Sequence, residues 1–362
     1  MYLVINLVIL LLFFSFISVI RVSETIKNWA YITSTIVSVL IFHTFKDYTL
    51  LPDIPQYIET FKYISRNNAS YEDANKMYKM KEGYYYLNKV IGYIWVNPQF
   101  FMFIIGAIIS TPYFILIKKY NKRYAWIACL LYYMGFVQST FVLRQHIAIS
   151  MCVMCVPLLA KTDGLNCKYI KEILLLTIIL LLAITIHPTA ILFLLLIACY
   201  YIKNYKLLFF IIAVCAYIIY NYLYDIAFYF AMSAGDYLQY MEEKEFPGWG
   251  TIVLNWGLLL FATISLKKMR DMQNHWMIMY KGLLLSALLS LISLADAASD
   301  AIPRLIMYLN CFSCIFIPFV ISNIRYKFLR ILIIVFFLIL YFYNFAISER
   351  SYINDCKLAD LL

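Results

Sequence analysis

The chain has 362 residues, of which 64% are hydrophobic and only 14% are charged, and its mean hydropathy is +0.79. Soluble domains are about half apolar and about a quarter charged, so this composition argues against a soluble enzyme, a nucleic-acid-binding domain or a disulfide scaffold. The formal net charge of +10 comes from short basic clusters between apolar runs, which is typical of the loops of an integral membrane protein.

The apolar residues occur in runs of about twenty, the length that an α-helix needs to cross a bilayer. We therefore predict an all-α integral membrane protein, a single polytopic domain over residues 1–362 with about twelve transmembrane helices. The first run has neither a basic flank nor a cleavage signature, so we expect it to be a retained helix. The expected spans are 2–20, 29–45, 99–117, 124–143, 145–160, 173–187, 189–202, 207–224, 251–266, 276–295, 304–322 and 331–347.

Alternate connections between these spans differ in charge. One set holds seventeen Lys and Arg against four acidic residues, whereas the opposite set, with both termini, holds twelve basic and sixteen acidic residues. The positive-inside rule makes the first set cytoplasmic, and its members are 21–28, 118–123, 161–172, 203–206, 267–275 and 323–330. The two long loops, 46–98 and 225–250, then lie outside, where we expect the chemistry. Gln56–Ser65 and Tyr84–Val96 are predicted to form short amphipathic helices along the membrane surface.

The long outer loop places carboxylates close to the membrane. Asp53 follows the end of an expected span, and Glu82 precedes an aromatic stretch. Carboxylates that are desolvated at a membrane face become usable bases. The alternative for both residues is ordinary solvation in a loop.

Arg144 lies in the very short turn between two expected spans, in the sequence Leu143-Arg144-Gln145. A desolvated guanidinium at this position costs about 3 kcal/mol and requires an anionic partner. The alternative is an interfacial arginine that reaches lipid headgroups or pairs with a loop carboxylate.

His187 and Pro188 interrupt the next apolar hairpin, again on the predicted outer side. A neutral imidazole there can accept a proton from a hydroxyl group or orient that hydroxyl. A helix cap or a hydrogen-bonded structural histidine is the alternative.

A second arginine, Arg304, follows Pro303, which favours the first turn of a helix. Arg304 then lies at the outer end of a span, although an intrahelical ion pair with Asp300 is an alternative. Two arginines on one side of the membrane suit a diphosphate, because the guanidinium fork binds phosphate oxygens in pairs. Some of the 33 tyrosines are available to stack on sugar rings, whereas interfacial belts account for most of them.

Metal chemistry has little support in the sequence. The two C-x-x-C pairs, Cys152/Cys155 and Cys311/Cys314, lie within apolar runs and lack the polar turn and flanking ligands of a zinc or redox site. We therefore expect no metal and no cofactor.

Five local patterns occur in order, and together they resemble the EpsG-type branch of the Wzy-like polysaccharide polymerases. They are Asp53-x-x-x-Tyr57, Glu82-Gly83-Tyr84 followed by Leu87-Asn88, Leu143-Arg144-Gln145-x-Ile-Ala148, His187-Pro188-x-Ala190 and Arg304-x-x-x-Tyr308. The sequence departs from the family at the first pattern, because Pro52 stands where a glycine is usual and a second acid, Asp47, lies upstream.

The resemblance implies a GT-C-like membrane polymerase of the bacterial cytoplasmic membrane that transfers a glycan from a polyprenyl diphosphate to a second lipid-linked repeat unit outside the cell. It also implies a chain-length regulator and a flippase as partners, besides the bilayer and the lipid-linked oligosaccharide. Substrate binding is then expected at Arg144, Arg304, Tyr57, Gln145 and Tyr308. The base is expected among Asp53, His187 and Glu82, which the sequence does not rank decisively.

Two other classes of protein remain open. A flippase or other transporter of lipid-linked oligosaccharides would bind the same substrate without reacting, but it predicts charges at mid-bilayer and internal repeats, and the sequence has neither feature. A membrane O-acyltransferase would need a catalytic histidine and an acyl-donor site, and the cytoplasmic connections contain no recognisable one.

Overall fold

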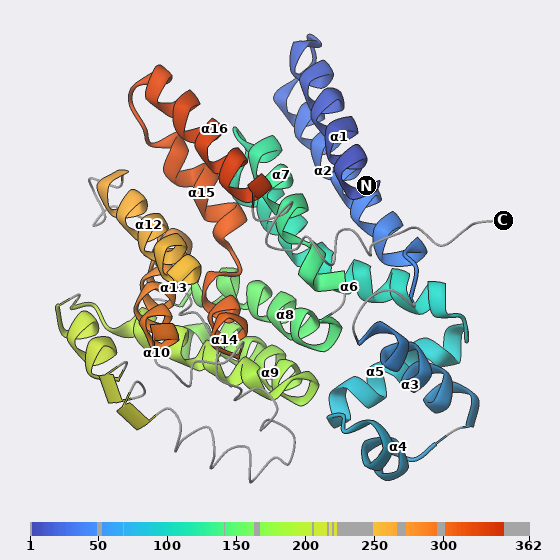
Figure 1. Cartoon of the computed structure of the whole chain (residues 1–362). Coiled ribbons are helices and arrows are strands. Elements are labelled where there is room, and N and C mark those ends of the chain that lie inside the picture. Colours follow the sequence, from blue (N-terminus) through green and yellow to red (C-terminus); the bar gives the residue numbers. More distant parts are fainter. Residues whose placement is uncertain are drawn as a thin grey trace. The chain divides into compact units, whose positions relative to one another are not determined.

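The computed structural model of the chain describes residues 2–48, 53–67, 69–140, 142–162, 167–204, 206–215, 217–218, 221–222, 249–265, 273–294 and 301–343. Every secondary-structure element among these residues is a helix (Figure 1). The chain divides into two compact units. Unit 1 contains Met1–Met154, Ile178–Pro188 and Ile317–Leu362, and unit 2 contains Cys155–Thr177 and Thr189–Phe316.

Unit 1 is built from the N-terminal helices and the last helix. Its elements are α1 (Tyr2–Val19), α2 (Glu24–Phe45), α3 (Ile54–Asn67), α4 (Tyr71–Tyr78), α5 (Glu82–Ile94), α6 (Pro98–Tyr120), α7 (Ala125–Gly135), the 3₁₀ turn η1 (Val137–Thr140) and α16 (Lys327–Tyr343). Unit 2 contains η2 (Cys167–Tyr169), α10 (Phe193–Tyr201), α12 (Trp249–Ser265), α13 (Asn274–Ser290), η6 (Leu291–Leu294) and α14 (Ala301–Asn310). Four elements have residues in both units: α8 (Leu143–Leu159), α9 (Ile170–Ile186), η3 (Pro188–Leu192) and α15 (Ser313–Ser322).

Among the described residues, two helices are long and apolar enough to cross a membrane, α1 and α6. A third span results if α14 and α15, which are bent by 43° at their junction, are counted together. The all-helical, membrane-type fold agrees with the prediction, but a set of twelve transmembrane helices is not confirmed. The expected outer loop 225–250 lies outside the described residues except where α12 begins.

The expected span 124–143 is shorter in the structure, because α7 ends at Gly135 and the 3₁₀ turn η1 follows. Within this turn, the Ser139 hydroxyl donates to the carbonyl of Phe136 at 2.5 Å and the Thr140 hydroxyl donates to Val137 at 2.7 Å. Short polar side chains that bond to backbone three residues away compete with the α-helical pattern. They explain why the apolar run does not continue as one helix into Arg144.

The predicted amphipathic helices of the loop 46–98 are confirmed as helices, namely α3 and α5, with the short α4 between them. Their apolar faces are buried: Phe61 of α3 is fully buried and stacks on Phe101 of α6, with ring centroids 4.5 Å apart. The loop is therefore a packed layer at the start of α6.

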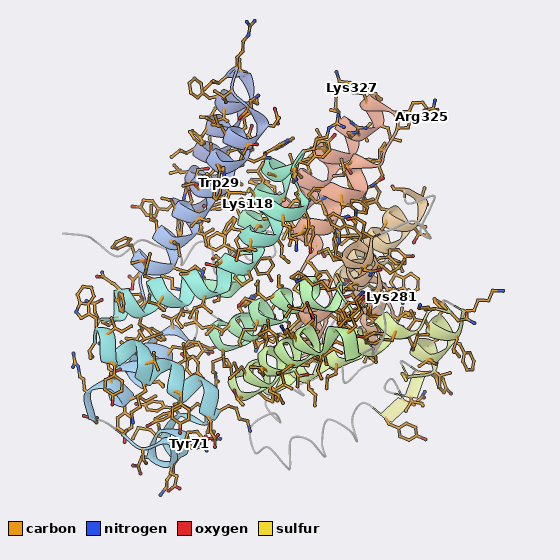
Figure 2. The ribbon with its side chains drawn as sticks, turned by 180° about the vertical axis from the view of Figure 1, so that it is seen from behind. Trp29, Tyr71, Lys118, Lys281, Arg325 and Lys327 are labelled. Carbon is orange, nitrogen blue, oxygen red and sulfur yellow. The ribbon has the colours of Figure 1, made fainter. Side chains whose placement is uncertain are left out.

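In unit 1, α2 and α6 form an antiparallel pair. Lys118 near the end of α6 lies over the ring of Trp29 near the start of α2, at 3.9 Å from the centroid (Figure 2). Toward the other end, Gly106 of α6 contacts the ring of His43 of α2. The pair therefore separates two ends of unit 1, one that carries the basic connections and one that carries the layer of α3 to α5.

The grouping of connections by charge matches their packing inside each unit. In unit 1, Asn28 donates to the carbonyl of Lys122 at 2.5 Å, and Arg330 donates to the hydroxyl of Tyr124 at 3.0 Å. The first bond joins connections 21–28 and 118–123, and the second joins connection 323–330 to Tyr124, the residue that directly follows 118–123. All three connections are predicted to be cytoplasmic.

Unit 2 shows the same pattern at the ends of α8, α10 and α13. The hydroxyls of Thr162 and Tyr201 are 2.8 Å apart, and Asn274 donates to the carbonyl of Ala160 at 3.0 Å. The ammonium of Lys281 donates to three backbone carbonyls at the end of α10, at 2.9–3.0 Å. Lys281, labelled in Figure 2, is only 3% exposed and replaces the missing helical donors at that terminus.

Candidate functional site

Arg144 stands in the first turn of α8, where it meets the layer of α3 to α5 within unit 1. Its Nη1 donates to the backbone carbonyl of Lys79 at 3.1 Å. Its guanidinium carbon lies 5.7 Å from the ring centroid of Tyr57 and 5.9 Å from that of Tyr84. Both distances are within the range of a cation–π contact, so the two tyrosines and one carbonyl fix the position of the guanidinium.

The Lys79 carbonyl is presented by an unusual backbone conformation. Lys79 caps the C-terminus of α4 with φ 46° and ψ 59°, which is the left-handed helical region, and its N–H donates to Asn75 at 2.8 Å. A residue other than glycine adopts this region only when its surroundings compensate for the strain. Here the left-handed cap ends α4 and turns the chain toward Arg144.

Tyr57 and Tyr84 form the aromatic wall of this site. Their rings meet edge to face with centroids 5.9 Å apart, and Tyr84 is only 1% exposed. The Tyr84 hydroxyl and the amide oxygen of Asn88 are both buried and have no hydrogen-bond partner among the described residues. Burial, together with the neighbouring Tyr57, raises the pKa of Tyr84 well above its ordinary value, and Arg144 and the adjacent Asn88 side chain offset only part of this effect. Tyr84 therefore stays protonated and can act as a hydrogen-bond donor.

Gly83 brings the start of α5 against the end of α9. A Cβ atom on Gly83 would lie 2.4 Å from the Thr185 hydroxyl oxygen and 2.9 Å from its backbone carbonyl carbon and oxygen. Only glycine permits an approach this close. The Glu82-Gly83-Tyr84 pattern thus packs on the segment that leads directly to His187, whose N–H continues α9 by donating to Ala183 at 2.9 Å.

The two candidate carboxylates of the outer loop are exposed and stand at helix starts. Asp53 directly precedes α3 with φ 63°, and its carbonyl accepts the N–H of Tyr57 at 3.0 Å. Aspartate is one of the few residues besides glycine that adopts positive φ with some frequency. Glu82 is the first residue of α5. Pro52 lies outside the described residues, whereas Asp47 is half-buried.

A buried polar cluster behind Arg144 was not recognised in the sequence. Lys46 is 1% exposed, and its ammonium donates to the carbonyl of Thr140. His43 is fully buried, with its Nε2 3.2 Å from the hydroxyl oxygen of Ser139. These side chains hold the turn η1 that leads into Arg144. The available signal was the pair of polar residues at the end of α2, His43 in its last turn and Lys46 at its C-cap, but Lys46 follows an apolar run and resembles an ordinary loop charge.

The remaining pattern belongs to unit 2. Arg304 is half-buried in the first turn of α14, as its position after Pro303 predicted. Tyr308 is fully buried, and its hydroxyl accepts a hydrogen bond from Thr189 at 3.1 Å. This bond connects Thr189, the residue that follows Pro188, to Tyr308 within unit 2. The joint use of Arg144 and Arg304 stays a prediction, and the alternative partner Asp300 lies outside the described residues.

Within the part of the chain that the structure describes, no three His, Cys, Asp or Glu side chains gather where they could hold a metal ion.

Gln145, the other predicted binding residue, is 3% exposed and packs inside unit 1 at the start of α8.

The model of the EpsG family matches residues 29–357, nearly the whole chain. The chain belongs to the EpsG family. Searches among curated proteins and among solved structures give no match. Membership confirms the resemblance drawn from the five motifs and implies a glycosyltransferase-like polymerase of polysaccharide biosynthesis that works at a membrane on a lipid-linked oligosaccharide.

The match places all five patterns of this EpsG-family protein inside the family region. Three of them lie together in unit 1 at the starts of α3, α5 and α8, where Arg144 contacts Tyr57 and Tyr84. Of the fourth pattern, His187 and Pro188 belong to unit 1 and Ala190 belongs to unit 2. The roles of the individual residues stay predictions, because family membership does not assign them.

Proposed function

We propose that this EpsG-family protein polymerises oligosaccharide repeat units that are carried on polyprenyl diphosphate, at the outer face of the bacterial cytoplasmic membrane. The observation that supports this most directly is the setting of Arg144. Its guanidinium lies against Tyr57 and Tyr84, at one end of unit 1, next to the α5–α9 contact that leads to His187. A cation beside aromatic faces suits an anionic leaving group attached to a sugar.

The proposed reaction is a displacement at the anomeric carbon of the donor glycan. The hydroxyl oxygen of the acceptor sugar forms a bond to that carbon, and the bond from the carbon to the diphosphate oxygen breaks with its electron pair. The leaving diphosphate gains negative charge in the transition state, where a fixed guanidinium is most effective. Arg144 supplies that charge, and Arg304 is the second candidate.

The acceptor hydroxyl must lose its proton as the new bond forms. His187, Asp53 and Glu82 are the candidate bases, and all three lie in segments that belong to unit 1. Asp53 and Glu82 are exposed and therefore accessible to a substrate, while His187 is half-buried beside the Gly83–Thr185 contact. We place Asp53 and His187 ahead of Glu82.

The test uses a strain that lacks the chromosomal copy of the gene and carries plasmid variants, with surface polysaccharide resolved by length on a gel. We expect Arg144→Ala to abolish long chains, while Arg144→Lys restores them only in part because lysine lacks the guanidinium fork. Arg66→Ala is the matched control, since Arg66 is an exposed arginine of α3 in the same layer. Normal chain length in Arg144→Ala would refute the proposal.

The same strains separate polymerisation from transport. Loss of long chains with single repeat units still reaching the cell surface supports a polymerase. Retention of the lipid-linked precursor inside the cell would instead support a flippase. Substitutions Asp53→Asn, Glu82→Gln and His187→Gln, measured in parallel, identify the base as the one whose loss stops polymer formation while the protein stays in the membrane.

A further inference from the structure

A basic cavity lies in unit 1 at the end of the α2–α6 pair that carries the predicted cytoplasmic connections. It has a volume of about 610 Å³, and its walls come from the start of α2, the turn between α6 and α7, and the start of α16. Its lining residues are Glu24, Lys122, Arg123, Tyr124, Lys327, Arg330, Ile331 and Ile334. Four cations and one carboxylate thus face one cavity.

The carboxylate does not neutralise this cavity. Glu24 forms an ion pair with Lys27, the next turn of α2, at 3.5 Å. Among the described residues, Lys122, Arg123 and Lys327 have no ion pair, and all three are exposed. Figure 2 shows Lys327 close to Arg325 at the turn that precedes α16. The cavity therefore keeps a net positive charge.

Arg330 forms the inner wall and is fixed by neutral partners. Its Nη1 donates to the Tyr124 hydroxyl at 3.0 Å, and its Nη2 donates to the carbonyl of Ile324 at 2.5 Å. The Nε atom is buried and has no hydrogen-bond partner in the described part of the chain. A guanidinium held only by neutral oxygens keeps its full charge for an anion in the cavity.

The apolar residues of the cavity favour a phospholipid headgroup over a free phosphate as the bound anion. Ile331 and Ile334 lie next to the cations, and the outward face of α16 continues from them with exposed Leu332 and Val335. A free phosphate gains nothing from such a surface, whereas a phospholipid places its headgroup among the cations and its acyl chains along the helix. Basic pockets between helices at a membrane face suit anionic headgroups for this reason.

We propose that this cavity binds the phosphate of an anionic phospholipid such as phosphatidylglycerol. Lys122 and Lys327 contact the headgroup from the two sides, Arg330 lies behind it, and the acyl chains follow α16. The bound lipid would join the start of α16 to the α6–α7 turn. This site is distinct from the surroundings of Arg144, because the two lie at opposite ends of α2.

The experiment measures thermal unfolding of the full-length protein, purified in detergent, as phosphatidylglycerol is titrated against phosphatidylcholine. We expect phosphatidylglycerol to raise the unfolding temperature. The double variant Lys122→Gln/Lys327→Gln should weaken this binding by on the order of tenfold, because each basic residue near a membrane surface contributes a several-fold factor. The matched control is Lys168→Gln/Lys171→Gln, which removes two exposed charges from another predicted cytoplasmic connection.

Two results would overturn the proposal. One is equal stabilisation of both double variants, which would mean that the headgroup acts through general charge. The other is competition by millimolar inorganic phosphate with full loss of the lipid effect, which would assign the cavity to a free anion. The single variant Arg123→Gln gives an independent measurement if the double variant does not purify, and its binding should also fall.

Discussion

The close contact between Gly83 and Thr185 gives the sharpest test of the site, because it decides whether the substitution Gly83→Ala stabilises or destabilises the protein. In an ordinary exposed helix, replacement of glycine by alanine stabilises by about 0.5–1 kcal/mol. At Gly83, the new methyl group would meet backbone atoms of Thr185 at 2.9 Å and its hydroxyl oxygen at 2.4 Å. Backbone atoms cannot rotate away, so α5 must separate from the end of α9.

The magnitude follows from two opposing terms. Overpacking of this kind costs about 1–3 kcal/mol, and contacts with backbone place Gly83→Ala in the upper part of that range. After the helix-propensity gain is subtracted, a net loss of about 1–2 kcal/mol remains. Because the contact also positions the segment that leads to His187, we expect shorter polysaccharide chains as well as a lower unfolding temperature.

Two further variants define the assay. Gly257→Ala in α12 is the control, because no atom lies within 4 Å of its Cβ position, and it should be neutral or slightly stabilising. The pair Gly83→Ala/Thr185→Ala removes the 2.4 Å contact but leaves the backbone contacts, so it should recover only part of the loss. A Gly83→Ala protein with wild-type stability and wild-type chain length would show that α5 and α9 do not pack this closely.

Three other substitutions probe separate parts of the structure, each by thermal unfolding in detergent and by polymer length on a gel. Tyr84→Phe removes a buried hydroxyl without a partner, so stability should stay level or rise by about 1 kcal/mol while chain length falls; a loss of stability would contradict this account. Lys46→Met frees the Thr140 carbonyl and should lower stability by about 2 kcal/mol and abolish long chains, whereas unchanged chains would separate the cluster from Arg144. Lys281→Met removes three charge-assisted bonds at the end of α10 and should cost about 3 kcal/mol or more; wild-type stability would mean that those bonds are not made.

Two features of the fold could be predicted from short stretches of sequence, namely the helices of the outer loop and the grouping of the connections by charge. The helices α3 and α5 were predictable because their stretches of the outer loop contain enough aromatic and aliphatic residues to form helices along a membrane surface. The grouping of the connections was predictable because the charge of a loop records the side on which it lies. The contact of Asn28 with Lys122, and that of Asn274 with Ala160, agrees with that grouping in each unit.

Contacts between distant segments could not be predicted in the same way. Lys46 and Thr140 are 94 positions apart, and so are Asn28 and Lys122, but only the second pair lies in regions whose charge marks them as neighbours. The break at η1 was missed because hydropathy does not register that Ser139 and Thr140 bond to backbone three residues earlier. Similarly, the sequence alone suggests only that Gly83 lowers the stability of a helix. The need for a glycine at this position is visible only in the structure, where Thr185 packs against it.

The two proposed sites lie at opposite ends of α2, and the length of this helix sets the distance between them. Its 22 residues rise by about 1.5 Å each, or about 33 Å in total, which is close to the roughly 30 Å hydrocarbon thickness of a bilayer. The basic cavity includes Glu24 at one end of α2, while the cluster of His43 and Lys46 lies at the other end, behind Arg144. If α6, the candidate span that packs antiparallel to α2, crosses the bilayer, the two sites lie in opposite headgroup layers. A substrate whose lipid tail stays in one leaflet could then reach Arg144 without meeting the cavity, so phosphatidylglycerol and the lipid-linked glycan should not compete for binding.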